Sequence, residues 1–243
     1  MLSKKKRVHA WSCSVLLLLN ILSVSAQEEN SLSDWSIGGD LVTRFYWRGM
    51  NLSESPAFQP YFECSVGAVT LGSWGSYSFS KEPCQEIDMY VSFEMKNARI
   101  TVYDYFSPTD SMDVSHHYFD WHNQSTAHAV EVIVEAWGIL GTPFSLEAGV
   151  FVYGDDKSDT GDNYYSAYFE PRYHFSAGEN EIRVFAGFTP MESLYADQFD
   201  FVNVGIMASR EIQINDNYSL PFIAQVAVNP NSESVFMIAG ISF

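Results

Sequence analysis

Residues 86–96 read EIDMYVSFEMK, and two kinds of side chain alternate along them. The apolar positions are Ile87, Met89, Val91, Phe93 and Met95, and the positions between them are Asp88, Tyr90, Ser92, Glu94 and Lys96. Successive side chains of a β-strand point to opposite faces, so this period of two predicts a strand with one apolar and one polar face.

Segments of this kind recur along the whole chain, whereas helical periodicity is scarce. Each is rich in aromatic and β-branched residues and is bounded by turn residues, which is typical of strands. The predicted strands are 35–49, 57–66, 69–80, 86–97, 99–107, 127–139, 143–154, 164–175, 181–190, 200–211, 218–229 and 233–243. No Gly/Ser-rich or Pro-rich linker divides them, which indicates one domain.

The lengths of the connections alternate as well. The links after 57–66, 86–97 and 127–139 are tight, whereas those after 35–49 and 99–107 are long and acidic. Such alternation distinguishes the two ends of a meander of antiparallel strands.

The strands of a soluble β-sandwich and of a membrane β-barrel both alternate in this way. The choice between the two folds depends on which face of the strands is apolar. Here the polar faces mix acids, bases and tyrosines, as in a wet lumen, while Trp35, Trp47 and Phe243 lie near the ends of apolar faces. We therefore expect an all-β fold, a closed antiparallel up-and-down transmembrane β-barrel of about 12 strands, with both termini in the periplasm. The last strand, VFMIAGISF (235–243), is expected to close the ring on the first.

The first 26 residues predict a secretory signal peptide, with Lys4, Lys5, Lys6 and Arg7 before an apolar core. Residues 27–243 then form the barrel, which we expect in the bacterial outer membrane. The formal net charge of the whole chain is −17. Removing the signal peptide makes the chain more acidic, so nucleic acid is excluded as a partner.

The polar faces supply the candidate site residues, which are those expected to line the lumen. They are Asp40, Arg44, Arg48, Gln59, Glu63, Asp88, Glu94, Glu131, Glu135, Glu147, Glu170, Arg172, His174, Arg183 and Gln225. Buried acids need counter-ions, and Arg44, Arg48, Arg172 and Arg183 are expected to supply them. The set fits either a structural ion-pair network or an acid-lined, cation-preferring pore.

Two loops carry residues that could bind metals. His116, His117, Asp120 and His122 lie in the long third loop, but their spacing matches no established zinc site. Residues 155–163 resemble part of a calcium-binding loop, yet Ala167 stands where the bidentate Glu should be. We expect no resident metal or cofactor.

The two cysteines of the mature chain test the register of the second hairpin. With the turn near Gly67, Cys64 lies opposite Leu71 and too far from Cys84 for a disulfide. A turn at Trp74 would instead bring the two cysteines together.

The start of the predicted barrel resembles a family of bacterial outer-membrane barrels, the TorF-type porins. The resemblance rests on TRFYWRGMNLSESPAFQPYFE and GSWGS, and the matching positions are Trp47, Arg48, Gly49, Ala57, Gln59, Pro60, Ser73, Trp74 and Ser76. EIDMYVSF, ITVYDYFSPT and YYSAYFEPRYHF are similar to later strands of that family. Phe243 also resembles the signal that outer-membrane barrels present to their assembly machinery. The resemblance implies a barrel with a transport role and no catalytic residue.

The leading functional hypothesis is a narrow porin or channel for small solutes or ions, and not an enzyme. Its expected partners are the outer-membrane lipid bilayer, the barrel assembly machinery, and small solutes or cations. An outer-membrane lipid or peptide hydrolase is an alternative, with His128 or the third-loop histidines beside Asp120 as bases. A structural or adhesive barrel whose third loop is the functional part is another.

Overall fold

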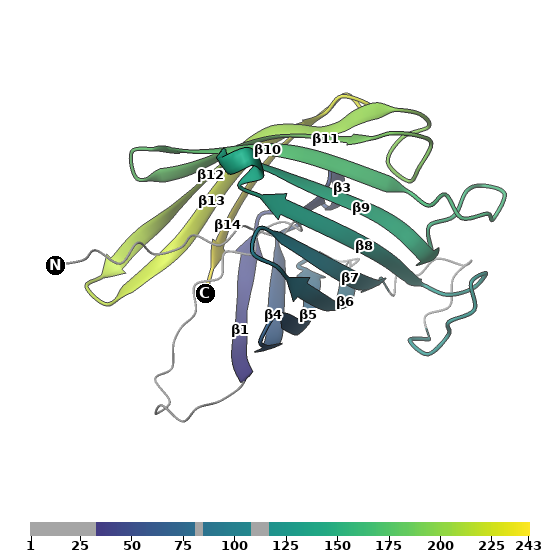
Figure 1. Ribbon diagram of the computed structural model, residues 1–243, viewed down its shortest axis with the longest axis horizontal. Helices are drawn as coiled ribbons and strands as arrows, with labels where there is room; N and C mark the ends of the chain where they lie inside the picture. Colours follow the sequence, from purple (N-terminus) through teal and green to yellow (C-terminus); the bar gives the residue numbers. More distant parts are fainter. Residues whose placement is uncertain (1–32, 81–84, 108–116) are drawn as a thin grey trace.

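The computed structural model describes residues 33–80, 85–107 and 117–243, and it shows a closed barrel of twelve antiparallel strands (Figure 1). The barrel strands are β1 (Ser33–Val42), β4 (Ala57–Val66), β5 (Val69–Ser78), β6 (Gln85–Glu94), β7 (Ala98–Phe106), β8 (His128–Trp137), β9 (Phe144–Gly154), β10 (Ala167–Ala177), β11 (Asn180–Thr189), β12 (Asp200–Asn215), β13 (Tyr218–Asn229) and β14 (Ser234–Ser242). The predicted all-β, up-and-down barrel of twelve strands is confirmed. The predicted signal peptide lies outside the described residues.

Each barrel strand pairs with its neighbours along the chain, and β14 pairs back with β1 to close the ring. Tight turns at residues 67–68, 95–97, 178–179 and 216–217 lie at one end, together with residues 138–143, which contain the short helix η1 (Ile139–Gly141). The longer connections, 43–56, 107–127, 155–166 and 190–199, belong to the opposite end. β1 begins and β14 finishes at the tight-turn end, so the predicted distinction between the two ends is confirmed.

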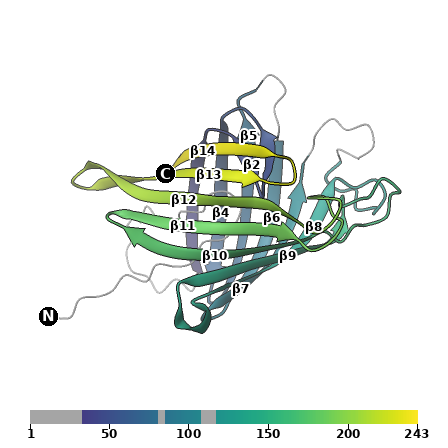
Figure 2. The same ribbon diagram turned by 90° about the horizontal axis from the view of Figure 1, so that it is seen from above.

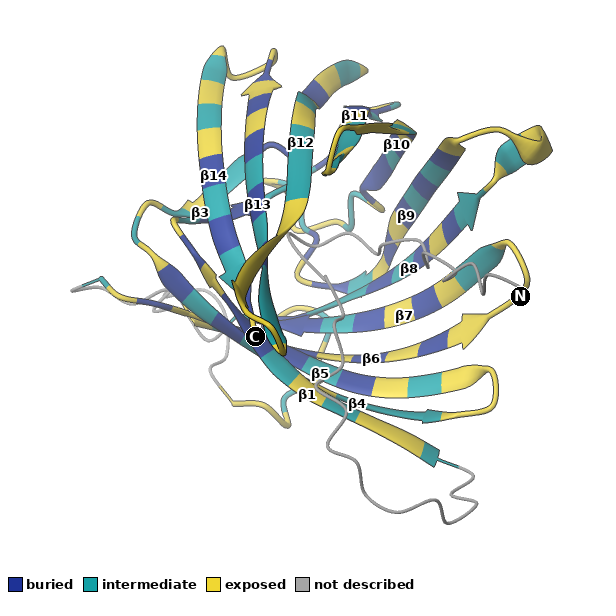
Figure 3. Cartoon of the chain, turned by 90° about the vertical axis from the view of Figure 1, so that its left-hand side faces the viewer, coloured by how far each residue is buried: buried dark blue, intermediate teal, exposed yellow. Residues whose placement is uncertain are grey.

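Alternation of the two faces gives each strand a banded pattern of burial (Figure 3). On β6, Met89, Val91 and Phe93 are exposed on the outer face, whereas Asp88 and Tyr90 are buried inside. This is the reverse of a soluble protein, in which exposed positions are mostly polar. Among the described residues, no helix has the length and apolar character needed to cross a membrane.

The prediction of one continuous strand over residues 35–49 is wrong. β1 finishes at Val42, and β2 (Phe45–Trp47) and β3 (Met50–Ser53) pair only with each other as a hairpin. Arg48 and Gly49 form its turn with φ of 44° and 89°. Two consecutive residues with positive φ are typical of a two-residue hairpin turn, which reverses the chain.

The β2–β3 hairpin lies across the interior of the barrel. Phe45 contacts Trp74 of β5 with 5.6 Å between ring centroids, and Tyr46 contacts Phe236 of β14 at 5.1 Å. Trp47 contacts Tyr105 of β7 at 5.7 Å. Because these rings reach three separate parts of the wall, the hairpin occupies interior space that a straight first strand would leave open. Figure 2 shows the ring of strands from above.

The register of the second barrel hairpin agrees with the sequence-based prediction. β4 and β5 turn at Gly67, and Cys64 lies opposite Leu71. Cys64 is a free thiol. Cys84 lies outside the described residues.

We expect the hairpin to tolerate no side chain at Gly49. An added Cβ would collide with the backbone carbonyl of Val202, and alanine disfavours the positive φ. Gly49→Ala should lower the free energy of unfolding in urea by about 2–4 kcal/mol, combining backbone strain with overpacking.

Gly67→Ala is the matched control, because Gly67 also has a positive φ but nothing lies within 4 Å of its added Cβ. It should cost only about 1–2 kcal/mol, the strain alone. Equal losses for the two variants would contradict the position of the hairpin inside the barrel.

Candidate functional site

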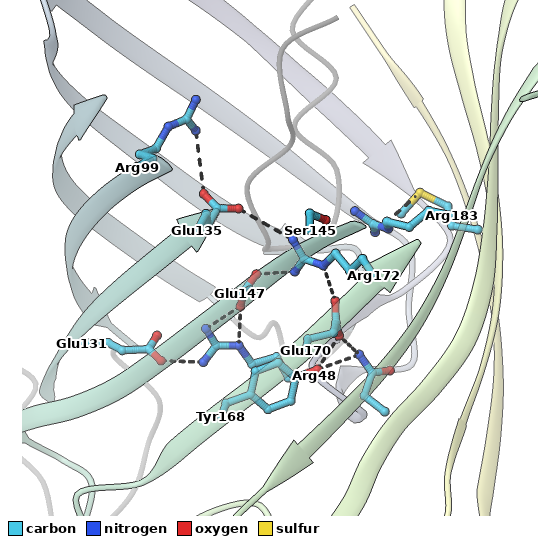
Figure 4. A network of polar contacts seen from close by, with 12 residues as sticks. Arg48, Arg99, Glu131, Glu135, Ser145, Glu147, Tyr168, Glu170, Arg172 and Arg183 are labelled. Atoms are coloured by element: carbon cyan, nitrogen blue, oxygen red, sulfur yellow. Dashed lines mark hydrogen bonds and ion pairs between the residues drawn. The ribbon is translucent and has the colours of Figure 1, made fainter. Parts of the chain in front are cut away.

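Arg48, at the tip of the β2–β3 hairpin, reaches two carboxylates on the opposite wall (Figure 4). Its guanidinium donates to Oε1 of Glu131 on β8 at 2.6 Å and to Oε1 of Glu147 on β9 at 2.8 and 3.2 Å. It also donates to the hydroxyl of Tyr195 at 2.8 Å. The side chains of Arg48, Glu131 and Glu147 are completely buried, so this is an ion-pair cluster shielded from water.

Two aromatic rings enclose the same guanidinium. Its central carbon lies 4.7 Å from the ring centre of Trp47 and 4.6 Å from that of Tyr168, within the range of cation–π attraction. Burial by itself lowers the pKa of Arg48, but the carboxylates of Glu131 and Glu147 raise it by a larger amount. The pKa of Arg48 therefore lies above its ordinary value, and the group stays charged.

A second arginine extends the cluster along β9 and β10. Arg172 donates to Oε1 of Glu170 at 2.6 Å, pairs with Oε2 of Glu147, and lies 3.7 Å from Glu135. Glu170 also accepts from Asn203 at 2.8 Å. Asn203 in turn accepts from Tyr46 of the hairpin at 2.7 Å, so the network is tied to the hairpin at a second point.

Toward the tight-turn end the side chains become more exposed. Arg99 on β7 pairs with Glu94 at 3.2 Å and lies 4.0 Å from Glu135, while Glu63 accepts from Tyr90 at 2.6 Å. Arg183 is partly buried, and its guanidinium lies 5.8 Å from the ring of Phe185.

Seven of the predicted site residues therefore meet in one network. These are Arg48, Glu94, Glu131, Glu135, Glu147, Glu170 and Arg172, to which Arg99, Tyr105, Tyr168, Tyr195 and Asn203 are added. Tyr105 and Tyr168 are on the inward faces of their strands, so the period of two could have identified them. Tyr195 lies in the 190–199 connection, where no periodic signal exists.

The remaining predicted residues are placed elsewhere. Arg44 follows β1 rather than lying on it, and its guanidinium is 5.9 Å from the ring of Phe236. His174 is hydrogen-bonded to Ser145 at 2.8 Å, and Gln225 is buried on β13. Asp40, Gln59 and Asp88 are buried on β1, β4 and β6, and within the described residues neither Asp40 nor Asp88 forms an ion pair with an arginine of the network. Asp88 lies opposite Tyr105 of β7, at the border of the network.

In the described part of the third loop, residues 117–127, polar side chains form hydrogen bonds with one another. His122 Nδ1 lies 2.9 Å from Oδ1 of Asp120, and Ser125 donates to Oδ2 of Asp120 at 2.9 Å. His116 lies outside the described residues. Within the described part of the chain, no group of three or more His, Cys, Asp or Glu side chains is arranged to hold a metal ion.

Comparisons of the chain with protein-family models, with curated proteins and with solved structures found no match. The likeness to TorF-type porins therefore remains a resemblance of short motifs. The structure adds that the Trp47-Arg48-Gly49 part of those motifs is the tip of the hairpin in the barrel interior.

We expect Arg48 and Glu131 to be energetically coupled. Arg48→Ala leaves the buried carboxylate of Glu131 without a counter-ion, while Glu147 keeps Arg172, and it should lower the free energy of unfolding by about 3–5 kcal/mol. Adding Glu131→Gln removes this charge, so the double variant should be less destabilised than the sum of the singles by about 1–3 kcal/mol.

The measurement is a double-mutant cycle from urea unfolding in detergent micelles. Glu179→Gln is the control partner, because its ion pair with Arg210 is exposed and remote from Arg48. Additive effects of Arg48→Ala and Glu131→Gln would contradict the buried pair.

Proposed function

We propose that the protein is a bacterial outer-membrane β-barrel that forms a narrow, cation-preferring pore for small solutes or ions. The observation that carries the proposal is the distribution of side chains, which is apolar outside and charged inside. That distribution suits a wall with hydrocarbon on one side and water or ion pairs on the other.

The outer face supports the membrane part of the proposal. Large apolar side chains are exposed on every part of the ring, among them Ile37, Phe62, Leu71, Val91, Val102, Val134, Val152, Phe175, Val184, Ile206, Val226 and Met237. A soluble monomer rarely exposes a continuous apolar surface of this extent. We propose the lipid bilayer as its partner, and the barrel assembly machinery as the partner of β14 and the exposed Phe243 beside it.

The interior supports the pore and its narrowness. Carboxylates outnumber guanidinium groups among the buried side chains, which favours cations over anions. The β2–β3 hairpin occupies part of the cross-section, and its contacts with β5, β7 and β14 leave less room than the strand number alone implies.

We further propose that the barrel is not an enzyme. His128, the strongest candidate for a catalytic base, has both ring nitrogens engaged. Nδ1 lies 2.8 Å from Asp104 and Nε2 lies 2.6 Å from the carbonyl of Tyr118, while Trp121 stacks on the ring. This environment fits a histidine that anchors the third loop, because a base needs a free nitrogen facing the substrate.

The test is single-channel conductance of the purified full chain in planar bilayers. The wild-type protein should conduct with a preference for K⁺ over Cl⁻. Replacing residues 45–53 by a flexible Gly/Ser linker should raise the conductance by about threefold or more, because the hairpin no longer narrows the lumen.

A matched control replaces residues 156–164 of another long connection by a linker of the same length, which should leave the conductance within about 1.5-fold of wild type. An electrically silent wild-type protein would contradict the pore. Conductance unchanged by loss of the hairpin would contradict its role as a constriction.

A further inference from the structure

The interior of the barrel has two chemically different walls. On β8, β9 and β10, each of Glu131, Glu135, Glu147 and Glu170 lies within ion-pair distance of Arg48 or Arg172. On β1 and β6 lie further inward carboxylates, among them those of Asp40, Glu86 and Asp88. Among the described residues, none of these three is within 4.0 Å of a basic group.

These three carboxylates have no ion-pair partner in the described part of the chain and belong to a continuous polar strip, in which Glu86 accepts a hydrogen bond from Ser107 at 2.9 Å. Ser242 of β14 lies opposite Asp40 of β1, and Asp40 lies opposite Gln59 of β4. Gln59 donates to Ser76 of β5 at 3.2 Å, and Ser76 lies opposite Glu86 of β6. The strip therefore crosses five neighbouring strands, and Asp88 is the next inward residue of β6.

Oxygen atoms in this strip lack hydrogen-bond partners although they are buried. Oδ2 of Asp40, Oε1 of Gln59 and Oδ1 of Asp88 have none. The exposed fractions of these three residues are 1%, 0% and 2%. A buried acceptor without a donor costs free energy, and a buried carboxylate without a counter-ion costs more.

A small cation meets both needs, because it neutralises carboxylates and the oxygen atoms of the strip can replace part of its hydration shell. The β8–β10 wall offers it nothing comparable, since arginines already occupy those carboxylates. Trp74, which lies opposite Asp88, contacts Phe45, so the hairpin lies next to the strip and narrows the space beside it.

We propose that small inorganic cations such as Na⁺ and K⁺ pass along the strip formed by Ser242, Asp40, Gln59, Ser76, Glu86 and Asp88, and that Asp40 and Asp88 set the preference for cations. The inference rests on the proposed pore function and assigns its route and its selectivity residues. Glu131 and Glu147 then hold the hairpin in place and do not contact the permeating ion.

The test is the reversal potential of the full-length barrel in planar bilayers across a KCl gradient. Asp40→Asn and Asp88→Asn keep the size of each side chain and remove its charge. The double variant should lower the K⁺/Cl⁻ permeability ratio by about fivefold, as expected for the loss of charges close to the ion path. Asp40→Glu and Asp88→Glu keep the charge, so their K⁺/Cl⁻ permeability ratios should stay near that of the wild type.

Glu94→Gln is the control that removes the same charge elsewhere. Glu94 lies at the tight-turn end, its side chain is 42% exposed and it is paired with Arg99. Salt screens an exposed charge, so this variant should change the ratio by less than about twofold.

The outcomes separate this inference from the pore itself. Suppose that the wild-type barrel is cation-selective, but its K⁺/Cl⁻ permeability ratio is unchanged by Asp40→Asn and Asp88→Asn or falls equally in Glu94→Gln. The proposed route is then wrong, while the proposed pore stands. A silent wild-type barrel overturns both. Asp40 and Asp88 lie on separate strands, so the single variants test the route independently if one of them does not fold.

Discussion

The hydrogen bonds between β1 and β14 are the contact on which the rest of the structure depends. They pair Asp40, Leu41 and Val42 with Ser242, Ile241 and Gly240, and Gly39 exchanges two further bonds with Phe243 at 2.9 and 3.0 Å. Without this seam both strands would present open edges, and in hydrocarbon each unpaired N–H or C=O costs several kcal/mol. Closure is therefore what permits an apolar outer face and a charged interior in one molecule.

Closure also places charged side chains where they must find partners, and the β2–β3 hairpin supplies some of them. Arg48 lies in the turn of the hairpin, and the chain has to reverse there for Arg48 to reach the interior of the barrel. In this position it bridges Glu131 of β8 and Glu147 of β9. A buried ion pair adds little net stability compared with an apolar pair, but it penalises any other position of the hairpin. The network thus specifies where the hairpin lies and leaves the β1–β6 wall acidic.

Alternation predicted most of the wall, because a barrel strand with an apolar outer face and a polar inner face has to alternate. The bounds 57–66 and 218–229 agree with β4 and β13, and the turn at Gly67 gave the register of Cys64. The hairpin was not predictable in this way, since residues 40–48 alternate as regularly as a wall strand does. Glu86 was identifiable as an inward residue, because it lies two positions before Asp88 on the same strand. Asn203 and Tyr195, in contrast, join the network only through contacts across the interior.

The most direct test of the account is a scan of nitroxide labels along β6 in lipid bilayers, at single cysteines introduced after Cys64 and Cys84 are changed to serine. Labels at Met89, Val91 and Phe93 should collide mainly with lipid-soluble oxygen, and labels at Tyr90 and Ser92 should not. Labels at Met89, Val91 and Phe93 that collide mainly with a water-soluble relaxation agent would contradict a lipid-facing outer wall.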